Sequence, residues 1–336
     1  MINVGLIGIG GMGRMHFGCY QNNPDARLMA ICDGDPAKLR GDWSGISLNL
    51  DDTKSELVDL SGIETYSKVE DILANPEIDM IDICLPTPLH AQIAIAAMRA
   101  GKHVFCEKPM AMNDEECAQM EEVQRETGKQ LMIGHCLRYW PEYVITDQLI
   151  KGGEYGKVIS ASFHRSSGTP LGSFNNWLAT GAQSGGAVLD MHIHDVDTAL
   201  WWFGTPDSME VDGVIWRDLP LSSEASWRYK DGPLVTLHGS WDPHGGPFRM
   251  AFRVVMEEAS VIYDSATNVF QLLQVTREGD QSRDLKAPEE LAYQNEIDDF
   301  VACLNEGRVI ERVTPATSRL SVVVTRQEME LIAGKQ

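Results

Sequence analysis

The sequence is poor in positive charge: 28 Lys and Arg residues stand against 49 Asp and Glu residues, a formal net charge of −21. A surface of this charge repels phosphate backbones and anionic lipids, so we expect neither nucleic acid nor a membrane as a partner. The negative electrostatic potential of such a surface also opposes the binding of an anionic substrate. We therefore expect a small neutral substrate.

Several other features are missing. The seven cysteines include no Cys-x-x-Cys pair and their number is odd, which predicts buried, reduced thiols and no disulfide framework. The first residues lack the basic segment and cleavage site of a signal peptide. No apolar run reaches the roughly 18 residues that a membrane span needs. Together these absences predict a cytoplasmic protein without a metal or disulfide scaffold.

The length of 336 residues suggests two domains, at roughly 100–200 residues for each. No internal repeat and no linker rich in Pro, Gly or Ser is visible. A change of pattern in mid-chain predicts one domain over 1–136 and an α+β domain over 137–336. Packing of the C-terminal helices back on the first domain stays open.

In the first half, short apolar runs alternate with helical segments, which predicts a parallel sheet covered by helices on both faces. Residues 41–60 are rich in Asp, Ser and Gly and are expected to form a surface loop or small excursion. Asn113 and Gly128 are expected to begin and end one helix. The predicted strands are 2–7, 28–32, 79–85, 103–106 and 130–134, and the predicted helices are 14–22, 90–99 and 114–127.

The second half predicts a mostly antiparallel, open sheet with helices on one face. Apolar residues at 297, 300, 301 and 304 define one face of a helix within the tail 288–334. The predicted strands are 158–164, 208–216, 225–229, 234–241, 248–256 and 259–263, with a helix over 186–203.

A glycine-rich motif, Gly8-Ile9-Gly10-Gly11-Met12-Gly13, lies between the first strand and the first helix. It fits GxGxxG, which opens the nucleotide-binding Rossmann fold. Gly8 allows the tight turn, Gly10 lets the backbone approach a pyrophosphate, and Gly13 lets helix and strand pack closely. The helix N-terminus, with Gly11 and Met12, then offers N–H groups to the anion. We predict a dinucleotide site here.

Asp33 ends the second strand, twenty residues after Gly13. A carboxylate at this place accepts from the ribose 2′-OH and repels a 2′-phosphate. Gly34-Asp35 follows, with no Arg or Lys to receive that phosphate. The sequence therefore predicts NAD as the cofactor in preference to NADP.

Two further motifs are Glu107-Lys108-Pro109, at the end of a strand, and the Gly185-Gly186-x3-Asp190-x3-His194 pattern. With the glycine motif, they occur in the order and spacing of the glucose-fructose oxidoreductase/inositol dehydrogenase/MocA-like family, which this sequence resembles over nearly its whole length. The resemblance is strongest from 1 to 205.

The resemblance implies catalytic roles for Lys108, Asp190 and His194. It also implies that Glu107 and Lys108 lie at the nicotinamide and that the Lys108–Pro109 bond is cis. Family members often form tetramers through the open sheet of the second domain, so a homo-oligomer, tetramer or dimer, is expected. The resemblance further places the segment after the third strand beside the cofactor, with Pro86, Thr87 and His90.

The chemistry expected of these groups is general base catalysis, since removing a hydride from an alcohol carbon requires the hydroxyl proton to leave. Asp190 and His194 are four residues apart and share a face of a regular helix. Either Lys108 or His194 takes the proton, and the residues leave this choice open. Asp190 would orient His194 and a substrate hydroxyl.

Other candidates are weaker. Arg165, Trp177 and Tyr293 are candidates for shaping a substrate pocket, and Trp177 is preferred because an aromatic face suits a sugar ring. His192 and His194 form a His-x-His pair, but residues two apart on a helix do not converge on a metal. A packed, hydrogen-bonded His192 is therefore expected, and no metal site.

Three functions fit this set of residues. The preferred one is an NAD-dependent dehydrogenase acting on a secondary alcohol or ketone of a sugar, glycoside or cyclic polyol. The second is a glycosidase that uses bound NAD for transient oxidation and elimination. The third is a non-catalytic sugar sensor on the same fold, against which the complete set Lys108, Asp190 and His194 argues.

Overall fold

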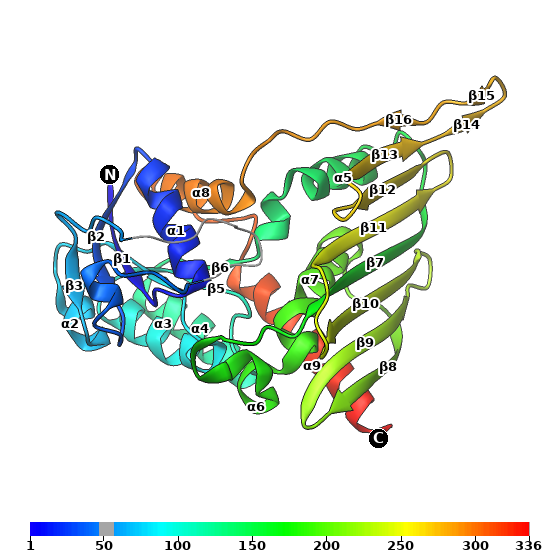
Figure 1. Ribbon diagram of the computed structural model, residues 1–336. Coiled ribbons are helices and arrows are strands. Elements are labelled where there is room, and N and C mark those ends of the chain that lie inside the picture. The colour runs from blue at the N-terminus through cyan, green and yellow to red at the C-terminus, as the bar shows by residue number, and fades with distance from the viewer. Residues whose placement is uncertain (47–56, 336) are drawn as a thin grey trace. The chain divides into compact units, whose positions relative to one another are not determined.

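The computed structural model describes residues 1–46 and 57–335. Its contacts divide the chain into two compact units (Figure 1). Unit 1 comprises Met1–Cys136 and Leu291–Arg319, and unit 2 comprises Leu137–Glu290 and Leu320–Gln336. A segment from the end of the sequence thus completes the N-terminal unit.

Unit 1 is built on a six-stranded parallel sheet in the order β3-β2-β1-β4-β5-β6. The five strands predicted from apolar runs are confirmed. The sixth strand, β3, has no buried residue and therefore carries no apolar run. The strands are β1 (Ile2–Ile7), β2 (Ala26–Cys32), β3 (Glu64–Tyr66), β4 (Met80–Ile83), β5 (His103–Glu107) and β6 (Leu131–Gly134).

The helices of unit 1 cover both faces of this sheet. The chain runs from β1 to β2 in one direction and from β4 to β6 in the other, so right-handed crossovers place the connecting helices on opposite faces. Accordingly α1 packs beside α8, and α3 packs beside α4 (Figure 1). The helices are α1 (Gly11–Asn22), η1 (Lys38–Arg40), α2 (Val69–Ala74), η2 (Thr87–Leu89), α3 (His90–Arg99), α4 (Asp114–Thr127) and α8 (Ala292–Glu306).

Helix α4 begins and ends where the sequence predicts. The Asn113 side chain accepts a hydrogen bond from the Glu116 main-chain N–H at 2.9 Å, which satisfies one of the unpaired donors of the first turn. Gly128 ends the helix in the left-handed conformation, with φ of 65°, which a glycine adopts without strain.

The surface loop or small excursion predicted over 41–60 lies partly outside the described residues, since 47–56 are not among them. Its two described ends are joined, because Val58 N–H donates to the Gly41 carbonyl at 2.8 Å. Trp43 is buried and packs edge-on against Phe17 of α1. The start of this segment is therefore part of the core of unit 1.

Unit 2 contains an eight-stranded sheet in the order β16-β13-β12-β11-β7-β10-β9-β8. Only β7 and β10 pair in parallel within it, so the predicted mostly antiparallel sheet is confirmed. A small hairpin joins β14 (Val275–Thr276) to β15 (Gly279–Asp280). The sheet strands are β7 (Val158–Gly168), β8 (Ser208–Trp216), β9 (Leu219–Arg228), β10 (Leu234–Asp242), β11 (Arg249–Met256), β12 (Ser260–Asp264), β13 (Val269–Leu273) and β16 (Arg283–Asp284).

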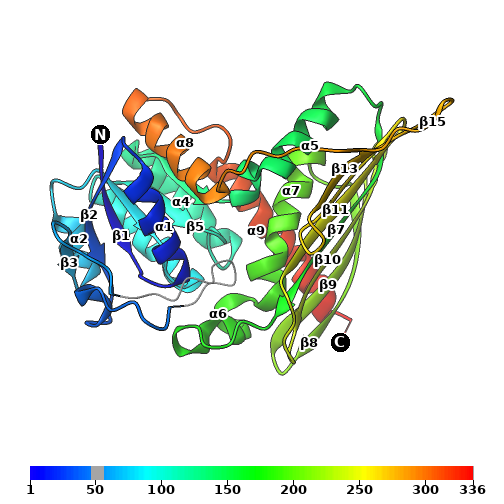
Figure 2. The same ribbon diagram turned by 45° about the horizontal axis from the view of Figure 1, so that its top comes forward.

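The long helices of unit 2 lie on one face of this sheet, as α5 and α7 show in Figure 2. Within the described part of unit 2, no helix covers the other face. The helices are η3 (Cys136–Tyr139), α5 (Pro141–Gly152), η4 (Phe174–Ala179), α6 (Gly181–Ser184), η5 (Val188–His192), α7 (Ile193–Phe203) and α9 (Pro315–Ala333), which enters unit 2 at Leu320.

The helix predicted over 186–203 is not a regular α-helix. Residues Val188–His192 form a π turn, η5, before α7 begins. A π turn is wider than an α turn and is found most often at functional sites. The expectation that Asp190 and His194 stand on a regular helical face is therefore wrong in its geometry, since Asp190 lies inside the wide turn.

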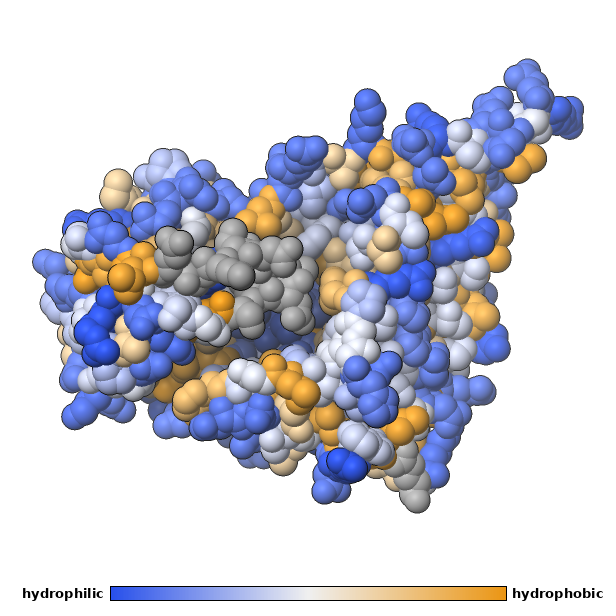
Figure 3. Space-filling model, in the orientation of Figure 1, coloured by the Kyte–Doolittle hydropathy of each residue, from blue (hydrophilic) through white to orange (hydrophobic). Residues whose placement is uncertain are grey.

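Hydrophilic side chains cover most of the visible surface of both units (Figure 3), in keeping with the net charge of −21. Six of the seven cysteines are buried, and none of the seven forms a disulfide. Among residues 1–46 and 57–335, no helix combines the length and hydropathy that crossing a bilayer requires.

Candidate active site

The glycine motif forms the loop between β1 and α1 and shows which glycines the fold itself requires. A Cβ on Gly8, which has φ of 93°, would lie 2.5 Å from the Cys84 carbonyl oxygen, and one on Gly13 would lie 1.9 Å from the Gly8 carbonyl oxygen. A Cβ on Gly10 would meet no atom within 4 Å of the described chain. Close packing thus explains Gly8 and Gly13, whereas the space beside Gly10 is open.

The N-terminus of α1 faces the same loop. Gly10 is its N-cap and no side chain caps the helix. Gly11 and Met12 form its first turn and are half-buried. Main-chain N–H groups at a helix start bind anions well, so these residues fit the pyrophosphate of a dinucleotide.

Asp33 follows β2, and its carboxylate is held in place by the main chain. It accepts from the Ile9 N–H at 2.7 Å and from the Asp35 N–H at 2.8 Å. Lys38 Nζ lies 3.3 Å from the same carboxylate. The expectation that no basic residue is near Asp33 is therefore wrong, because η1 brings Lys38 back to it from five residues ahead.

Lys108 follows β5 at the carboxyl edge of the sheet, where ligands bind in open α/β folds. In the fully described stretch from Val104 to Ala111, Lys108 is the one residue that is not buried. The Lys108–Pro109 peptide bond is cis, as expected. Glu107, directly before it, is buried and its carboxylate accepts from the Lys108 main-chain N–H at 3.1 Å.

His90 connects the ends of two neighbouring strands. Its ring nitrogens lie 2.7 Å from the Leu85 carbonyl oxygen and 2.8 Å from the Pro109 carbonyl oxygen. Burial lowers the pKa of His90, although both carbonyl groups favour the protonated ring. His90 and Thr87 are buried and Pro86 is half-buried, so this segment supports the loop that carries Lys108 within unit 1.

In unit 2, Asp190 and His194 stand out by their exposure. From Ser184 to Leu200, a fully described stretch, they are the two residues that are not buried. Their neighbours are fixed in the interior: Asp195 pairs with Arg165 at 2.9 Å and Asp197 with Arg138 at 2.8 Å. The segment is thus anchored by buried ion pairs and presents one carboxylate and one imidazole to the surface.

The three weaker candidates have different surroundings. The Arg165 guanidinium is buried and binds both carboxylate oxygens of Asp195, at 2.9 and 3.0 Å. Trp177 lies in η4 and is half-buried. Tyr293 is buried in the first turn of α8, in unit 1. Trp177 is the one of the three with substantial exposure.

Comparison with known proteins bears on this arrangement. Residues 2–135 match the domain described as "Oxidoreductase family, NAD-binding Rossmann fold", and residues 143–262 match the GFO/IDH/MocA C-terminal domain. The chain belongs to the Gfo/Idh/MocA family of oxidoreductases. The expected family and the expected NAD-binding Rossmann domain are thereby confirmed.

Curated relatives in this family include inositol dehydrogenases. The inositol 2-dehydrogenase of Rhizobium meliloti is 30% identical over 241 residues, which cover 71% of this chain and 66% of that protein. The scyllo-inositol 2-dehydrogenase (NAD(+)) of Bacillus subtilis is 32% identical over 206 residues, which cover 60% of this chain and 54% of that protein. The chain thus matches about half to two thirds of the length of these relatives.

Among solved structures, levoglucosan dehydrogenase in complex with NADH and levoglucosan matches with a TM-score of 0.84. The match covers 100% of this chain and 98% of that one, at 21% identity. It shows that the two proteins share a fold.

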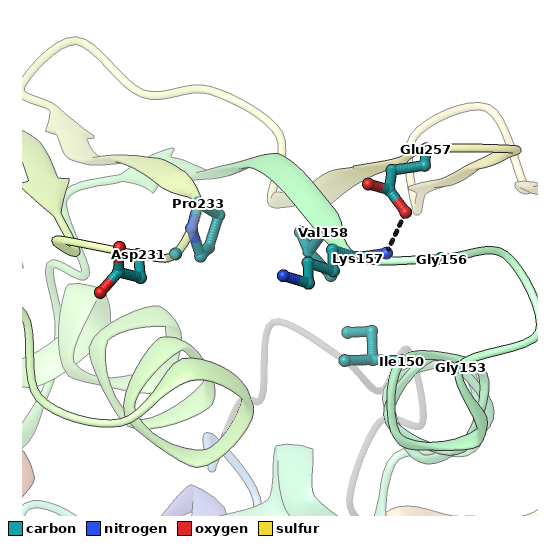
Figure 4. A pocket seen from close by; sticks show the side chains of 9 residues that line it. Ile150, Gly153, Gly156, Lys157, Val158, Asp231, Pro233 and Glu257 are labelled. Atoms are coloured by element: carbon teal, nitrogen blue, oxygen red, sulfur yellow. Dashed lines mark hydrogen bonds between the residues drawn. The ribbon is translucent and has the colours of Figure 1, made fainter.

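A cavity of about 460 Å³ lies elsewhere in unit 2, between the end of α5, the start of β7 and the turn before β10 (Figure 4). Lys157, Asp231 and Glu257 are its charged residues, and Glu257 accepts from the Lys157 main-chain N–H at 3.0 Å. None of the residues predicted for the active site lines this cavity. It is a surface hollow without the groups that hydride transfer requires.

Sequence reasoning missed several polar residues in the core of unit 1, chiefly His16 and Glu296. One signal was available, because Glu296 lies four residues before Phe300, on the apolar face predicted for α8. An acidic residue at a core position is rare unless it has a role. Lys38 was missed because proximity to Asp33 depends on the course of η1.

Proposed function

We propose that this chain is an NAD-dependent dehydrogenase that moves a hydride between the nicotinamide and a secondary alcohol or ketone carbon of a sugar, glycoside or cyclic polyol. The observation that carries the proposal is the exposure of Lys108, Asp190 and His194, each of which reaches the surface from an otherwise buried segment. Each of the three side chains is ionisable and half-buried. They are the groups that acid–base chemistry on an alcohol needs.

The cofactor would be held by the loop Gly8–Gly13, with Gly10, Gly11 and Met12 at the pyrophosphate and Asp33 at the adenosine ribose. Pro86, Thr87, His90 and Glu107 would support the nicotinamide end beside Lys108. Bound NAD supplies the hydride acceptor.

The chain supplies the proton acceptor and its orientation. Lys108 or His194 takes the hydroxyl proton, and Asp190 orients the imidazole and a substrate hydroxyl. A negatively charged protein favours a neutral substrate. The named activities of the inositol and levoglucosan dehydrogenases support a polyol or sugar as the substrate class. Trp177 is proposed as the surface on which an apolar sugar face packs.

A substrate screen tests the proposal. Inositols, aldoses, sugar acids and glycosides are each mixed with NAD and with NADP, while NADH or NADPH absorbance and product release are followed together. Net reduction of NAD with a polyol or sugar supports a dehydrogenase. Release of a sugar from a glycoside without net reduction would overturn it in favour of an NAD-using glycosidase. Ligand and cofactor binding without turnover of any compound would overturn it in favour of a sensor.

A homo-oligomer is part of the same proposal, with the helix-free face of the unit 2 sheet as the contact surface. The expected mass in solution, measured by light scattering during size-exclusion chromatography, is that of a dimer or tetramer. A monomer over the concentration range used for activity would contradict it.

A further inference from the structure

A group of buried ionisable side chains lies in unit 1 beneath the loop that carries Lys108. His16 of α1 contacts Asp82 of β4 through Nδ1 at 2.8 Å and Glu107 of β5 through Nε2 at 3.1 Å. Glu296 of α8 completes the group, with a carboxyl oxygen within 4.8 Å of both a His16 ring nitrogen and a Glu107 oxygen. All four residues are at most 5% exposed.

Glu296 differs from the other three in having no partner. Both of its carboxyl oxygens are buried, and neither has a hydrogen-bond partner among the described residues. Asp82, in contrast, accepts from the Tyr20 hydroxyl at 2.8 Å as well as contacting His16. An ionised carboxylate with no partner in the protein interior is far more costly than a neutral acid.

The charges of the group follow from these contacts. Burial opposes an imidazolium, but Asp82 and Cys84 together outweigh it and the pKa of His16 is raised well above its usual value. Burial likewise opposes a charged Glu107, but His16 outweighs it and the pKa of Glu107 is lowered. Burial raises the pKa of Glu296 well above its usual value, and the Glu107 charge raises it further. One cation thus faces two anions and one neutral acid.

We propose that Glu296 is a neutral acid that serves as a positioning residue for Lys108, a role that rests on the dehydrogenase function proposed above. While Glu296 carries its proton, Glu107 alone pairs with His16 Nε2, and its other oxygen accepts from the Lys108 main-chain N–H. If Glu296 ionises, three carboxylates compete for one imidazolium and Glu107 is repelled from its place. Loss of one buried proton therefore displaces the main chain at Lys108.

Other titratable groups surround this site and do not alter the assignment. Cys19 and Tyr20 of α1 and Cys84, just after β4, interact with His16 or Asp82, and burial raises the pKa of each. They are uncharged near neutral pH. Lys108 and His90 also act on Glu107, and both favour its ionised form. Tyr293, on the same helix as Glu296, and Cys106 interact with Glu107 as well, and burial raises the pKa of each.

The proposal has a definite pH signature. The folded protein holds a proton on Glu296 at pH values where the unfolded chain, with an ordinary Glu pKa of about 4.3, has released it. The folded state then binds more protons, so this residue makes stability fall as pH rises from about 4.3 towards the raised pKa of the folded state. Glu296→Gln keeps the shape of the neutral acid and removes this dependence.

The first test needs no substrate and therefore stands or falls apart from the dehydrogenase proposal. Infrared difference spectra at about pH 7, where ordinary carboxyl groups are ionised, should show a protonated-acid C=O band in the wild type that Glu296→Gln lacks. Glu306→Gln, an exposed residue of the same helix, should retain the band. If Glu296→Gln keeps every protonated-acid band of the wild type, the neutral-acid assignment is overturned.

Unfolding by urea gives a second readout. The midpoint of Glu296→Gln should exceed that of the wild type at about pH 8, and the gap should close towards pH 4.3. A gap that does not change with pH would show a purely steric role and overturn the proposal. A stoichiometric divalent metal found by elemental analysis in the wild type, and lost in Glu296→Gln, would overturn it as well, since His16, Glu107 and Glu296 would then bind that metal.

The positioning role is tested by activity once a substrate is known. Glu296→Gln should keep kcat within about twofold at neutral pH and move the alkaline loss of kcat to higher pH. Glu296→Leu, of similar size and likewise uncharged, should show the same alkaline shift while the NAD dissociation constant stays near that of the wild type. An alkaline loss of kcat that both variants keep at the pH of the wild type would overturn the positioning role and leave the proposed function untouched.

Discussion

The Nε2 atom of His192 lies 2.9 Å from a carboxylate oxygen of Glu328, and neither side chain is exposed. The two residues join the π turn η5 to helix α9 within unit 2. The Glu328 carboxylate also accepts from Trp227 Nε1 at 2.8 Å and from the Ser223 hydroxyl at 3.1 Å. His192 is thus the packed, hydrogen-bonded histidine that the sequence predicts, and it supports the turn that presents Asp190.

This pair makes unit 2 sensitive to the loss of one partner. Glu328→Ala leaves His192, Trp227 and Ser223 without their acceptor, and we expect it to lower the free energy of unfolding by about 3–5 kcal/mol. Glu330→Ala, an exposed residue of the same helix, should change it by less than about 0.5 kcal/mol. Urea unfolding measures both. Equal losses in the two variants would contradict a stabilising role for the buried contacts.

The same pair predicts a pH dependence. Burial opposes a charged His192, but Glu328 outweighs it and the pKa of His192 is raised. A raised pKa in the folded state means that the stabilisation is complete below about pH 6.5, the value of an unfolded histidine, and is lost as pH rises through the folded pKa. The difference in stability between wild type and Glu328→Gln should therefore shrink with rising pH. A constant difference from pH 6 to 9 would contradict the prediction.

Substitutions at the glycines of the β1–α1 loop should separate effects on stability from effects on cofactor binding. In Gly13→Ala the new Cβ meets the Gly8 carbonyl, so we expect a loss of roughly 2 kcal/mol or more in stability. Gly10→Ala meets no atom of the chain and should fold normally but bind NADH about tenfold or more weakly, because the pyrophosphate needs that space. Gly18→Ala, in the middle of α1 with open space around it, is the control. It should leave binding unchanged and raise stability by about 0.5–1 kcal/mol.

The contact between Asp33 and Lys38 leads us to expect that these two charges together set the choice between NAD and NADP. The wild type should prefer NAD, because the Asp33 carboxylate repels a 2′-phosphate. Asp33→Ser removes that repulsion and leaves Lys38 to bind the phosphate, so the ratio of kcat/KM for NAD over NADP should fall about tenfold or more. The double variant with Asp33→Ser and Lys38→Ala should lose the increase in kcat/KM for NADP that Asp33→Ser alone gives. A wild type that prefers NADP, or an unchanged ratio in Asp33→Ser, would refute the prediction.

The catalytic assignment is tested at Lys108 and His194. Lys108→Ala should bind NADH normally, since the glycine loop and Asp33 are intact, and lose about 10²–10⁴ in kcat. His194→Ala should do similar damage, and the double variant should lose less than the product of the two, because both groups act on one proton path. Lys157→Ala, in the unit 2 cavity that no predicted active-site residue lines, is the control. If Lys108→Ala turns over its substrate at a rate near that of Lys157→Ala, the assignment of Lys108 as a catalytic residue is wrong.

Much of the fold was predictable because local patterns report it directly. The apolar runs of β1, β2, β4, β5 and β6 alternate with helices, and for α4 the capping residues Asn113 and Gly128 also mark the two ends. Several elements escaped prediction, among them α2, α5 and β13, which bury some of their residues, and β3, which buries none. β3 has three residues and none is buried, so its strand conformation depends on pairing with β2 and leaves no hydrophobic pattern.

The candidate site was predictable only in part. Motif spacing indicated Gly8, Gly10 and Asp33, whereas the roles of Lys108 and His194 were implied by the family resemblance. Pairings across long separations gave no such signal. The sequence alone did not indicate that Arg165 pairs with Asp195, thirty residues away, or that His16 meets Glu107.

The amino-acid sequence by itself determined the family, the parallel sheet with its glycine loop, and the motifs that carry Lys108, Asp190 and His194. These depend on local periodicity and on spacing within a few residues. Tertiary structure alone decided the π turn at Asp190, the placement of Lys38 beside Asp33, and the position of α8 in unit 1, which brings Glu296 to His16 and Glu107. The reason is physical: the charge state of a buried group is set by its burial and by its neighbours in space, and only the folded chain brings those neighbours together.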